Sequence, residues 1–288
     1  MLRLVFSNDT PYENSSINQV INSNGEFENK TYRIQYGTKG IISIINKATG
    51  EELLDKRAPA LGSPVYQIFP NGERGDAAGF GYSARTKPHM EVHYPELLSF
   101  EMVESGDVFT HFKATYRIKG AVEAFSHYYL YTELPKIMVT AEIAKDLVRD
   151  PEGMYVCLPL TVEDGEWFLD KAGAFFKPGE QLPDGCCDYY SVNRGMVLSG
   201  THTGIAVNAL DTPMIMIKNL KLWDYTKTAD TSGPIYSWLC NNKWETNFRT
   251  QCAGYLESRY IIEMGAEVKE NGRQVLESNE LDILTVRA

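Results

Sequence analysis

The stretch of residues 98–144 limits the folds open to this chain more than any other feature. It holds four runs of residues that alternate or are rich in β-branched and aromatic side chains, separated by short turns with Gly, Pro or Asp. The runs cover residues 100–104, 108–118, 124–133 and 136–144. Such a succession predicts an antiparallel strand meander. The alternation from His111 to Ile118 further predicts that one face of the sheet lies against a core.

The rest of the sequence also predicts strands rather than helices. Residues 31–45 have the signature of a β-hairpin, with a turn expected at 37–40 and another after it at 47–50. Further strands are expected at 154–160, 173–176, 195–199, 204–208, 214–217, 235–239 and 259–264, and a turn at Asn271-Gly272 before a closing strand. No stretch of about 12 residues shows convincing helical periodicity. The pattern therefore predicts an all-β fold, a large antiparallel β-sandwich.

A chain of 288 residues is long enough for one large β domain or two smaller ones. Residues 1–26 are polar and rich in Asn and Ser, and we expect them to form a lead-in or linker segment. The β-sandwich domain is expected to span residues 27–288. Within it, residues 57–97 contain five prolines and several glycines, which predict long loops around short strands. Loops on a β scaffold often carry the binding residues.

The acidic composition narrows the range of partners. A net charge of −10 argues against a surface for nucleic acid or for an anionic membrane, and it fits a neutral small molecule or a glycan. No apolar run approaches the ~20 residues of a membrane-spanning helix, and the N-terminus lacks a signal-peptide core. The five cysteines are an odd number and predict reduced thiols rather than a disulfide framework. These features together predict a cytoplasmic location, unless the chain is a fragment of a larger protein.

The segment of residues 238–248, Trp-Leu-Cys-Asn-Asn-Lys-Trp-Glu-Thr-Asn-Phe, has the composition of a sugar-binding site. The C–H face of a pyranose can pack on an indole ring, and each Asn side chain offers a donor and an acceptor to sugar hydroxyls. The candidate carbohydrate-binding residues are Trp238, Asn241, Asn242, Trp244, Thr246 and Asn247. The alternative interpretation is a polar turn between two core tryptophans.

The sequence offers no metal site and no catalytic residue that can be assigned. His89 and His93 have the spacing of two zinc ligands on one helix face, but Pro88 and Pro95 flank them and disfavour a helix. On a strand the two rings would lie about 13 Å apart, too far for one metal. The 38 acidic residues contain no pair that the sequence can assign to glycoside hydrolysis. A nucleophile elbow and a phosphate-binding loop are missing from the sequence.

Three stretches carry a resemblance to a known family. Residues 237–248, followed by Arg259-Tyr260, resemble the Asn-Asn-x-Trp-x-Thr-Asn-Phe segment in the C-terminal β region of glycoside hydrolase family 38 α-mannosidases. Residues 27–53 resemble the segment that opens that β region, and residues 177–190 are similar to its Pro-x-x-Gln-x-Pro loop. The three matches follow the order of the family and span most of residues 27–264. The resemblance implies a galactose-mutarotase-like β-supersandwich.

The same resemblance implies that catalysis belongs to a different domain. In the family, the His and Asp ligands of the zinc ion and the aspartate nucleophile belong to an N-terminal α/β domain, and nothing in this sequence resembles that domain. The resemblance therefore implies a non-catalytic C-terminal β domain without a cofactor of its own. Its partners would be the zinc-dependent catalytic domain and a mannoside-like carbohydrate, whose cleft the residues of the Trp/Asn segment would help to shape.

Two other functions stay open. The chain is alternatively a stand-alone carbohydrate-binding module or a mutarotase-type sugar epimerase, an enzyme class that uses two histidines and a glutamate as acid and base. His127 and His202 are candidates for that role only by residue type. In the remaining alternative the domain is purely structural, and its Trp/Asn segment fixes a turn and buries two indoles.

Overall fold

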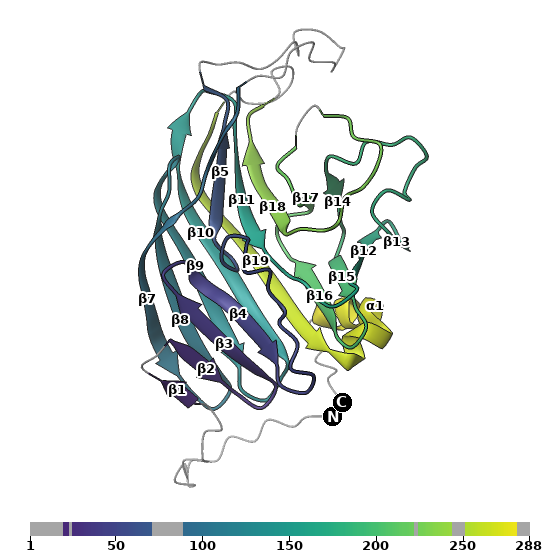
Figure 1. Cartoon of the computed structure of the whole chain (residues 1–288). Coiled ribbons are helices and arrows are strands. Elements are labelled where there is room, and N and C mark those ends of the chain that lie inside the picture. The colour runs from purple at the N-terminus through teal and green to yellow at the C-terminus, as the bar shows by residue number, and fades with distance from the viewer. Residues whose placement is uncertain (1–19, 23–24, 71–88, 222–223, 244–250, 281–288) are drawn as a thin grey trace, which may run out of the picture.

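Three antiparallel sheets stack as two layers (Figure 1). The computed structural model describes residues 20–22, 25–70, 89–221, 224–243 and 251–280. One layer is a nine-stranded sheet, and the other layer combines a six-stranded sheet with a four-stranded sheet. The segment that connects the two smaller sheets forms an isolated bridge to each side. Glu52 pairs with Ile45 of the four-stranded sheet, and Leu54 pairs with Leu160, just past a strand of the six-stranded sheet. The two smaller sheets therefore act together as one surface opposite the nine-stranded sheet.

The nine-stranded sheet contains the predicted meander. Its order is β13 (Ala174–Phe176), β12 (Glu166–Lys171), β15 (Gly195–Ser199), β16 (Gly204–Ala209), β19 (Cys252–Gly265), β10 (Lys136–Val148), β9 (Ala121–Tyr131), β8 (Phe109–Arg117) and β7 (Glu96–Ser105). The strands β7 to β10 are neighbours in sequence and in space, as a meander requires. β19 then pairs with β10 along almost its whole length and links the meander to the other half of the sheet.

The two smaller sheets form the opposite layer. The six-stranded sheet has the order β14 (Tyr190–Ser191), β17 (Met214–Ile217), β18 (Ile235–Asn241), β11 (Glu152–Leu158), β5 (Pro64–Ile68) and β6 (Glu91–His93). The four-stranded sheet consists of β1 (Val20–Asn22), β2 (Glu26–Glu28), β3 (Tyr32–Gly37) and β4 (Gly40–Asn46). On β18, Ile235 belongs to the core between the layers, whereas Tyr236 and Trp238 belong to a separate cluster on the outer face.

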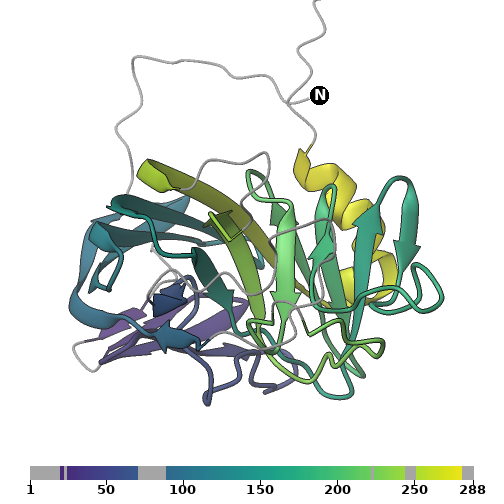
Figure 2. The same cartoon turned by 90° about the horizontal axis from the view of Figure 1, so that it is seen from above.

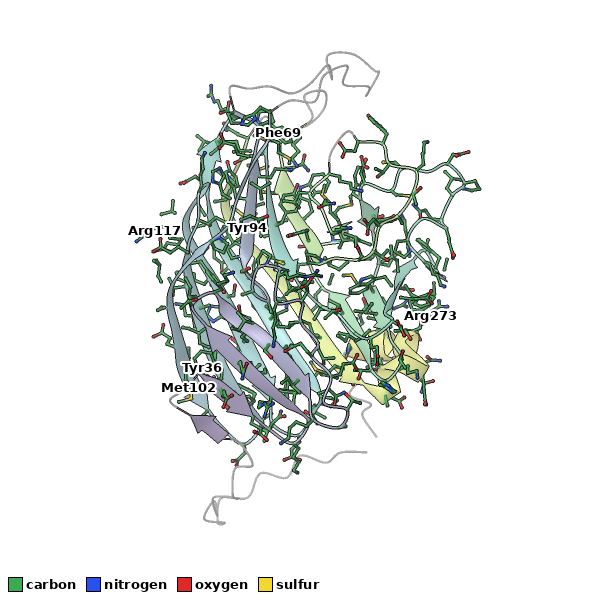
Figure 3. All side chains as sticks on the ribbon, in the orientation of Figure 1. Tyr36, Phe69, Tyr94, Met102, Arg117 and Arg273 are labelled. Atoms are coloured by element: carbon green, nitrogen blue, oxygen red, sulfur yellow. The ribbon has the colours of Figure 1, made fainter. Side chains whose placement is uncertain are left out.

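The main core fills the space between the layers and takes side chains from all three sheets (Figure 3). Its largest fully buried side chains are aromatic: Phe27, Tyr32, Tyr66, Phe112, Tyr128 and Tyr260. The tyrosine hydroxyls find partners inside the core. Tyr128 donates to the Leu61 carbonyl at 2.7 Å, and Tyr32 donates to the Tyr131 carbonyl at 3.0 Å. These bonds offset the cost of carrying a polar atom into an apolar interior.

One helix, α1 (Ala266–Glu280), covers the outer face of β15 and β16 (Figures 1 and 2). The prediction of a turn at Asn271-Gly272 and a closing strand is wrong here, because the chain stays helical with a local break at Asn271 (φ −127°, ψ 30°). The buried residues of the helix are Val268, Gly272, Val275 and Leu276. Their spacing is helical, but only one side of the helix is apolar, and the polar residues between them conceal the pattern.

The predicted all-β fold and large antiparallel sandwich are confirmed. The predicted hairpin corresponds to β3 and β4, and the four predicted strands of the meander correspond to β7 to β10. The sequence predicts neither β5, which begins at a proline among expected loops, nor β12. β1 and β2 pair within and beside the expected lead-in segment. Among the described residues, no helix has the length and apolar character that crossing a membrane requires.

Candidate functional site

The Trp/Asn segment begins on β18 and continues past the end of that strand. β18 carries Trp238 and Asn241, and Asn242 follows directly. Three of the six predicted carbohydrate-binding residues can therefore be placed. Trp244, Thr246 and Asn247 lie outside the described residues.

Trp238 lies on the outer face of the six-stranded sheet and is 4% exposed. Its ring stacks on Tyr155 of the neighbouring strand β11, with ring centres 5.8 Å apart and an angle of 22° between the planes. Tyr189 meets the indole edge-on at 5.9 Å. The indole nitrogen donates to the Cys240 carbonyl at 3.1 Å. Trp238 is therefore held by its neighbours in one orientation.

Asn242 is fully buried, and its side chain ties two segments together. Its carbonyl oxygen accepts the backbone N–H of Glu152 at 2.7 Å. Its amide nitrogen donates to the carbonyls of Asp150 at 3.1 Å and Val148 at 3.3 Å. The side chain thus closes the turn between β10 and β11 and fixes the direction in which the chain leaves β18. This is the turn-fixing role of the structural alternative.

Asn241 and Trp238 border a cavity of about 320 Å³ on the outer side of β18. Asp211, Thr212, Pro213 and Met214 form the other wall of this cavity. Asn241 is only partly buried, and its side-chain oxygen accepts the backbone N–H of Lys243 at 3.2 Å. A side-chain amide and an indole therefore lie at one opening, the combination that the sequence suggested for a sugar.

Lys243 is the unexpected residue of the segment, because it is fully buried. Its ammonium group donates to the side-chain oxygen of Gln67 and to the hydroxyl of Tyr155, the latter at 2.7 Å. It also lies 5.0 Å from the centre of the Trp238 ring and 5.4 Å from that of Phe69. Burial lowers the pKa of Lys243 well below that of an ordinary lysine, since the charged form loses its hydration. Nothing in the sequence signals this burial, because lysines are rarely enclosed.

A second buried charge lies beside the segment. Lys145 on β10 and Glu152 on β11 form an ion pair of 2.8 Å, and both side chains are inaccessible to solvent. Tyr66 donates to the same carboxylate oxygen of Glu152 at 2.5 Å, while the other carboxylate oxygen has no hydrogen-bond partner within the described residues. Burial raises the pKa of Glu152, and the hydrogen bonds from Lys145 and Tyr66 oppose that rise.

A pair of free thiols lies beside the segment. Cys240 lies on β18 and Cys252 begins β19. The hydrogen bond with Cys240 lowers the pKa of Cys252 to about 7, and the Cys252 thiol is also 3.2 Å from the Asn241 carbonyl. The same interaction raises the pKa of Cys240 above its ordinary value. The interaction thus favours the thiolate at Cys252 over the thiolate at Cys240.

A row of four titratable side chains crosses the outer face of the nine-stranded sheet. Glu104, His111, His127 and Glu142 come from the four adjacent strands β7 to β10. His111 Nε2 and His127 Nδ1 are 2.9 Å apart and share a hydrogen bond. Glu104 lies 3.9 Å from His111, and Glu142 lies 3.8 Å from His127. Burial lowers the pKa of both imidazoles, which favours a neutral pair at pH 7.

The structure does not bring His127 and His202 together. His202 lies in the turn between β15 and β16, with Nε2 3.5 Å from a carboxylate oxygen of Glu163. β16 is three strands away from β9, so at about 4.8 Å per strand the two histidines are more than about 14 Å apart. His111 is therefore the imidazole that could act with His127.

Two other histidines flank one carboxylate. His89 and His93 lie 3.8 Å and 3.0 Å from Glu91. In the described ranges, no three His, Cys, Asp or Glu side chains are arranged to hold a metal ion.

Comparison with known proteins shows which solved structures share this fold. The sequence matches no protein-family model and no curated protein. The structure is similar to an α-mannosidase from Enterococcus faecalis V583, with a TM-score of 0.63 and 12% identity over 91% of this chain and 32% of that protein. It is also similar to a protein of glycosyl hydrolase family 38 from Enterococcus faecalis, with a TM-score of 0.60 and 11% identity over 91% of this chain and 33% of that protein.

A weaker likeness, with a TM-score of 0.38 and 8% identity, is to an aldose epimerase homologue from C. elegans, over 86% of this chain and 98% of that protein. The chain spans about one third of the length of the two Enterococcus faecalis proteins. The likeness to them establishes a shared fold. The resemblance read from the sequence to the β region of family 38 α-mannosidases is thereby confirmed at the level of the fold.

Proposed function

We propose that this chain is the non-catalytic β domain of an α-mannosidase-like glycoside hydrolase. In this proposal it packs on a zinc-dependent catalytic domain and lines the carbohydrate cleft of that enzyme. The observation that carries the proposal is the extent of the structural likeness, since 91% of this chain corresponds to only 32% of an α-mannosidase. A domain of this share leaves most of such an enzyme for a separate catalytic part.

The end of β18 supports the carbohydrate part of the proposal. Trp238 and Asn241 border a cavity of about 320 Å³, which brings an aromatic residue and an amide to one opening. We assign the contact with a mannoside-like sugar to these two residues together with Trp244, Thr246 and Asn247. Asn242 has its amide committed to backbone groups, so its part is to position the segment.

The test uses the native protein. An antibody against the full chain isolates it from its source cells, and the precipitate is assayed with p-nitrophenyl α-D-mannopyranoside. We expect hydrolysis that a zinc chelator abolishes and added zinc restores, whereas the recombinant 288-residue chain hydrolyses none of the substrate. Hydrolysis by the isolated chain, or a precipitate that contains this protein but no α-mannosidase activity, contradicts the proposal.

A second candidate function is favoured by the row of Glu104, His111, His127 and Glu142. Interconversion of sugar anomers needs a base for the anomeric hydroxyl and an acid for the ring oxygen, and an imidazole pair between carboxylates can supply both. Polarimetry of freshly dissolved D-galactose and D-glucose tests this mutarotase activity. A rate above background that His127→Asn removes and His202→Asn preserves supports it, and a background rate rejects it.

A further inference from the structure

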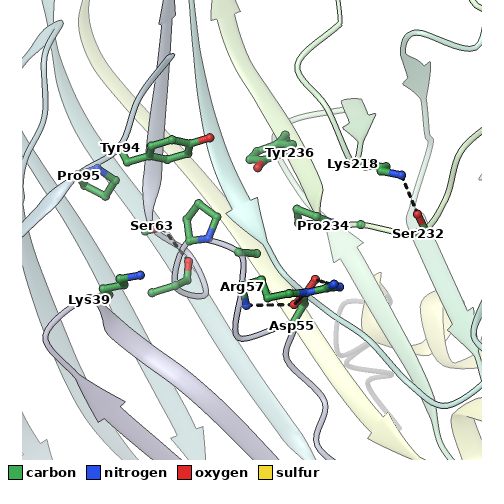
Figure 4. Close-up of a pocket in the computed structure, with 14 residues that line it drawn as sticks. Lys39, Asp55, Arg57, Ser63, Tyr94, Pro95, Lys218, Ser232, Pro234 and Tyr236 are labelled. Atoms are coloured by element: carbon green, nitrogen blue, oxygen red, sulfur yellow. Dashed lines mark hydrogen bonds and ion pairs between the residues drawn. The ribbon is translucent and has the colours of Figure 1, made fainter. Parts of the chain in front are cut away.

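A large cavity lies apart from the Trp/Asn segment, near the start of β18 (Figure 4). It has a volume of about 820 Å³, which falls within the usual size of small-molecule sites. Its walls come from the turn between β3 and β4, the loop of residues 55–63 and the connection from β6 to β7. The two ends of the β17–β18 connection and the start of β18 complete them. Parts of the chain that are distant in sequence thus converge on one hollow.

Two tyrosines give the cavity flat apolar walls. Tyr94 is 60% exposed, and Tyr236 is buried apart from 6% of its surface. Figure 4 shows the two rings on opposite sides of the hollow, with Pro95 beside Tyr94 and Pro234 below Tyr236. An aromatic ring open to a cavity is a surface on which the C–H face of a sugar ring can pack.

The hydroxyl of Tyr236 has no hydrogen-bond partner among the described residues, although the side chain is more than nine-tenths buried. The oxygen itself is open to the cavity rather than enclosed, so it is free to bond a partner from outside the protein. Burial, with smaller contributions from Cys157 and Tyr94, raises the pKa of Tyr236 above its ordinary value. The hydroxyl therefore keeps its proton at neutral pH and can donate it to a ligand oxygen.

One of the cationic side chains that line the cavity has no ion-pair partner among the described residues. Arg57 forms two hydrogen bonds with Asp55, at 2.9 Å and 3.0 Å. Lys218 is held by Asp230 at 2.5 Å and by Ser232 at 3.0 Å. Lys39 lines the cavity and makes no ion pair with any described residue. A positive wall of this kind stands out in a protein with a net charge of −10, and it favours a negatively charged group.

We propose that this cavity binds a pyranose that carries a carboxylate or another anionic group. The ring packs on Tyr94, a ring or hydroxyl oxygen accepts the Tyr236 hydroxyl, and the anion faces Lys39. The choice of a sugar rests on the proposed carbohydrate function. A second cavity of about 250 Å³ shares four lining residues with the first: Asp55, Arg57, Ser232 and Gly233. It gives room for a further sugar unit.

The experiment compares matched probes on the full chain labelled with 3-fluorotyrosine. D-Mannuronate, methyl α-D-mannopyranoside and inorganic phosphate are titrated while the fluorine signals are followed, and Tyr94→Phe and Tyr236→Phe assign the two reporter signals. We expect D-mannuronate to shift both signals and to bind at least about fivefold more tightly than the neutral mannoside, with the difference shrinking as salt screens the charge. Phosphate alone is expected to bind more weakly than D-mannuronate.

Variants locate the contacts. Lys39→Ala should reduce the affinity for D-mannuronate about fivefold and leave the neutral mannoside unchanged, whereas Lys171→Ala, at an exposed position on β12, should change neither. Tyr94→Ala should weaken both sugars about tenfold, whereas Tyr255→Ala, with 62% exposure on β19, should not.

Three outcomes overturn the proposal: no shift of either reporter, equal binding of phosphate and D-mannuronate, or binding that survives all the cavity variants. None of them affects the α-mannosidase assay of the native protein, which reports on the parent function separately.

Discussion

The two ends of β18 hold similar residue types and use them in opposite ways. Near its start, Tyr236 presents an unpaired hydroxyl to a cavity that Lys39 borders without an ion-pair partner among the described residues. Past its end, Asn242 and Lys243 are fully buried, and their polar atoms are engaged by neighbouring groups of the protein. The start of β18 has groups available for a ligand, whereas Asn242 and Lys243, just past its end, belong to a closed network.

This difference shows that residue type alone does not decide whether a polar cluster binds a ligand or forms an internal network. Aromatic rings beside amides and a lysine suit a sugar site, and they suit an internal network equally well. What separates the two is whether each polar atom already has a partner. The comparison can be tested directly, because a closed network loses stability when one member is removed, whereas a ligand site loses affinity.

The largest effect is expected at the ion pair beside the network. Lys145→Met leaves the carboxylate of Glu152 buried without its cation, and we expect a loss of about 3–5 kcal/mol in the free energy of unfolding. Urea denaturation at pH 7 measures it. In this variant a neutral Glu152 is favoured, so the folded carboxyl holds its proton above the pH at which the unfolded one releases it. The loss should therefore shrink as the pH is lowered toward 5.

The matched control for this change is the double variant Lys145→Met/Glu152→Gln. It removes both charges and keeps an acceptor for the Tyr66 hydroxyl. It should recover most of the stability lost in Lys145→Met, because an uncompensated buried charge is more costly than a neutral pair. A double variant as unstable as the single one would show that packing, not charge, holds β10 and β11 together at this point.

Asn242→Ala is expected to have the next largest effect. It leaves one backbone N–H and two backbone carbonyls without their partner, and we expect a loss of about 3 kcal/mol. Asn241→Ala removes one local hydrogen bond at a partly exposed site and should cost less than about 1 kcal/mol. Thermal and urea unfolding of the two variants measure these two losses in the free energy of unfolding. Equal losses would mean that the end of β18 is not the closed network described.

Lys243 gives the network a pH dependence. Its pKa is lower in the folded protein than in the unfolded chain, so between these two values the unfolded state binds more protons. The wild-type protein should therefore become more stable as the pH rises toward the ordinary lysine pKa of about 10.4. Lys243→Met lacks this term, so its stability relative to wild type should fall over the same range.

The measurement for Lys243 is the free energy of unfolding of wild type and Lys243→Met at several pH values from 7 to 10. The difference between the two proteins should change by no more than about 1.4 kcal/mol per pH unit, the limit for one proton. Lys171→Met controls for the loss of a lysine at an exposed position. A difference that is flat with pH would show that Lys243 keeps its charge in the folded protein.

How far the sequence predicted these features depends on the kind of information they need. Alternation along β8 is local, and it correctly predicted that strand with one face against the core. The helix α1 was missed because its buried residues are few and separated by charged ones. The candidate cavity depends on Tyr94, Lys39 and Tyr236, which come from three distant segments. No local pattern links such residues, and only the packing of the sheets brings them together.

The smallest expected effect tests the open end of β18. Tyr236→Phe removes a hydroxyl that has no partner among the described residues and keeps the ring, so the free energy of unfolding should change by less than about 0.5 kcal/mol. Tyr128→Phe provides the matched comparison, because its hydroxyl donates to the Leu61 carbonyl at 2.7 Å inside the core and its removal should cost about 1–2 kcal/mol. A loss in Tyr236→Phe as large as that in Tyr128→Phe would mean that the Tyr236 hydroxyl has a partner within the protein. The start of β18 would then resemble the closed network of Asn242 and Lys243, and the cavity would have lost its donor for a ligand.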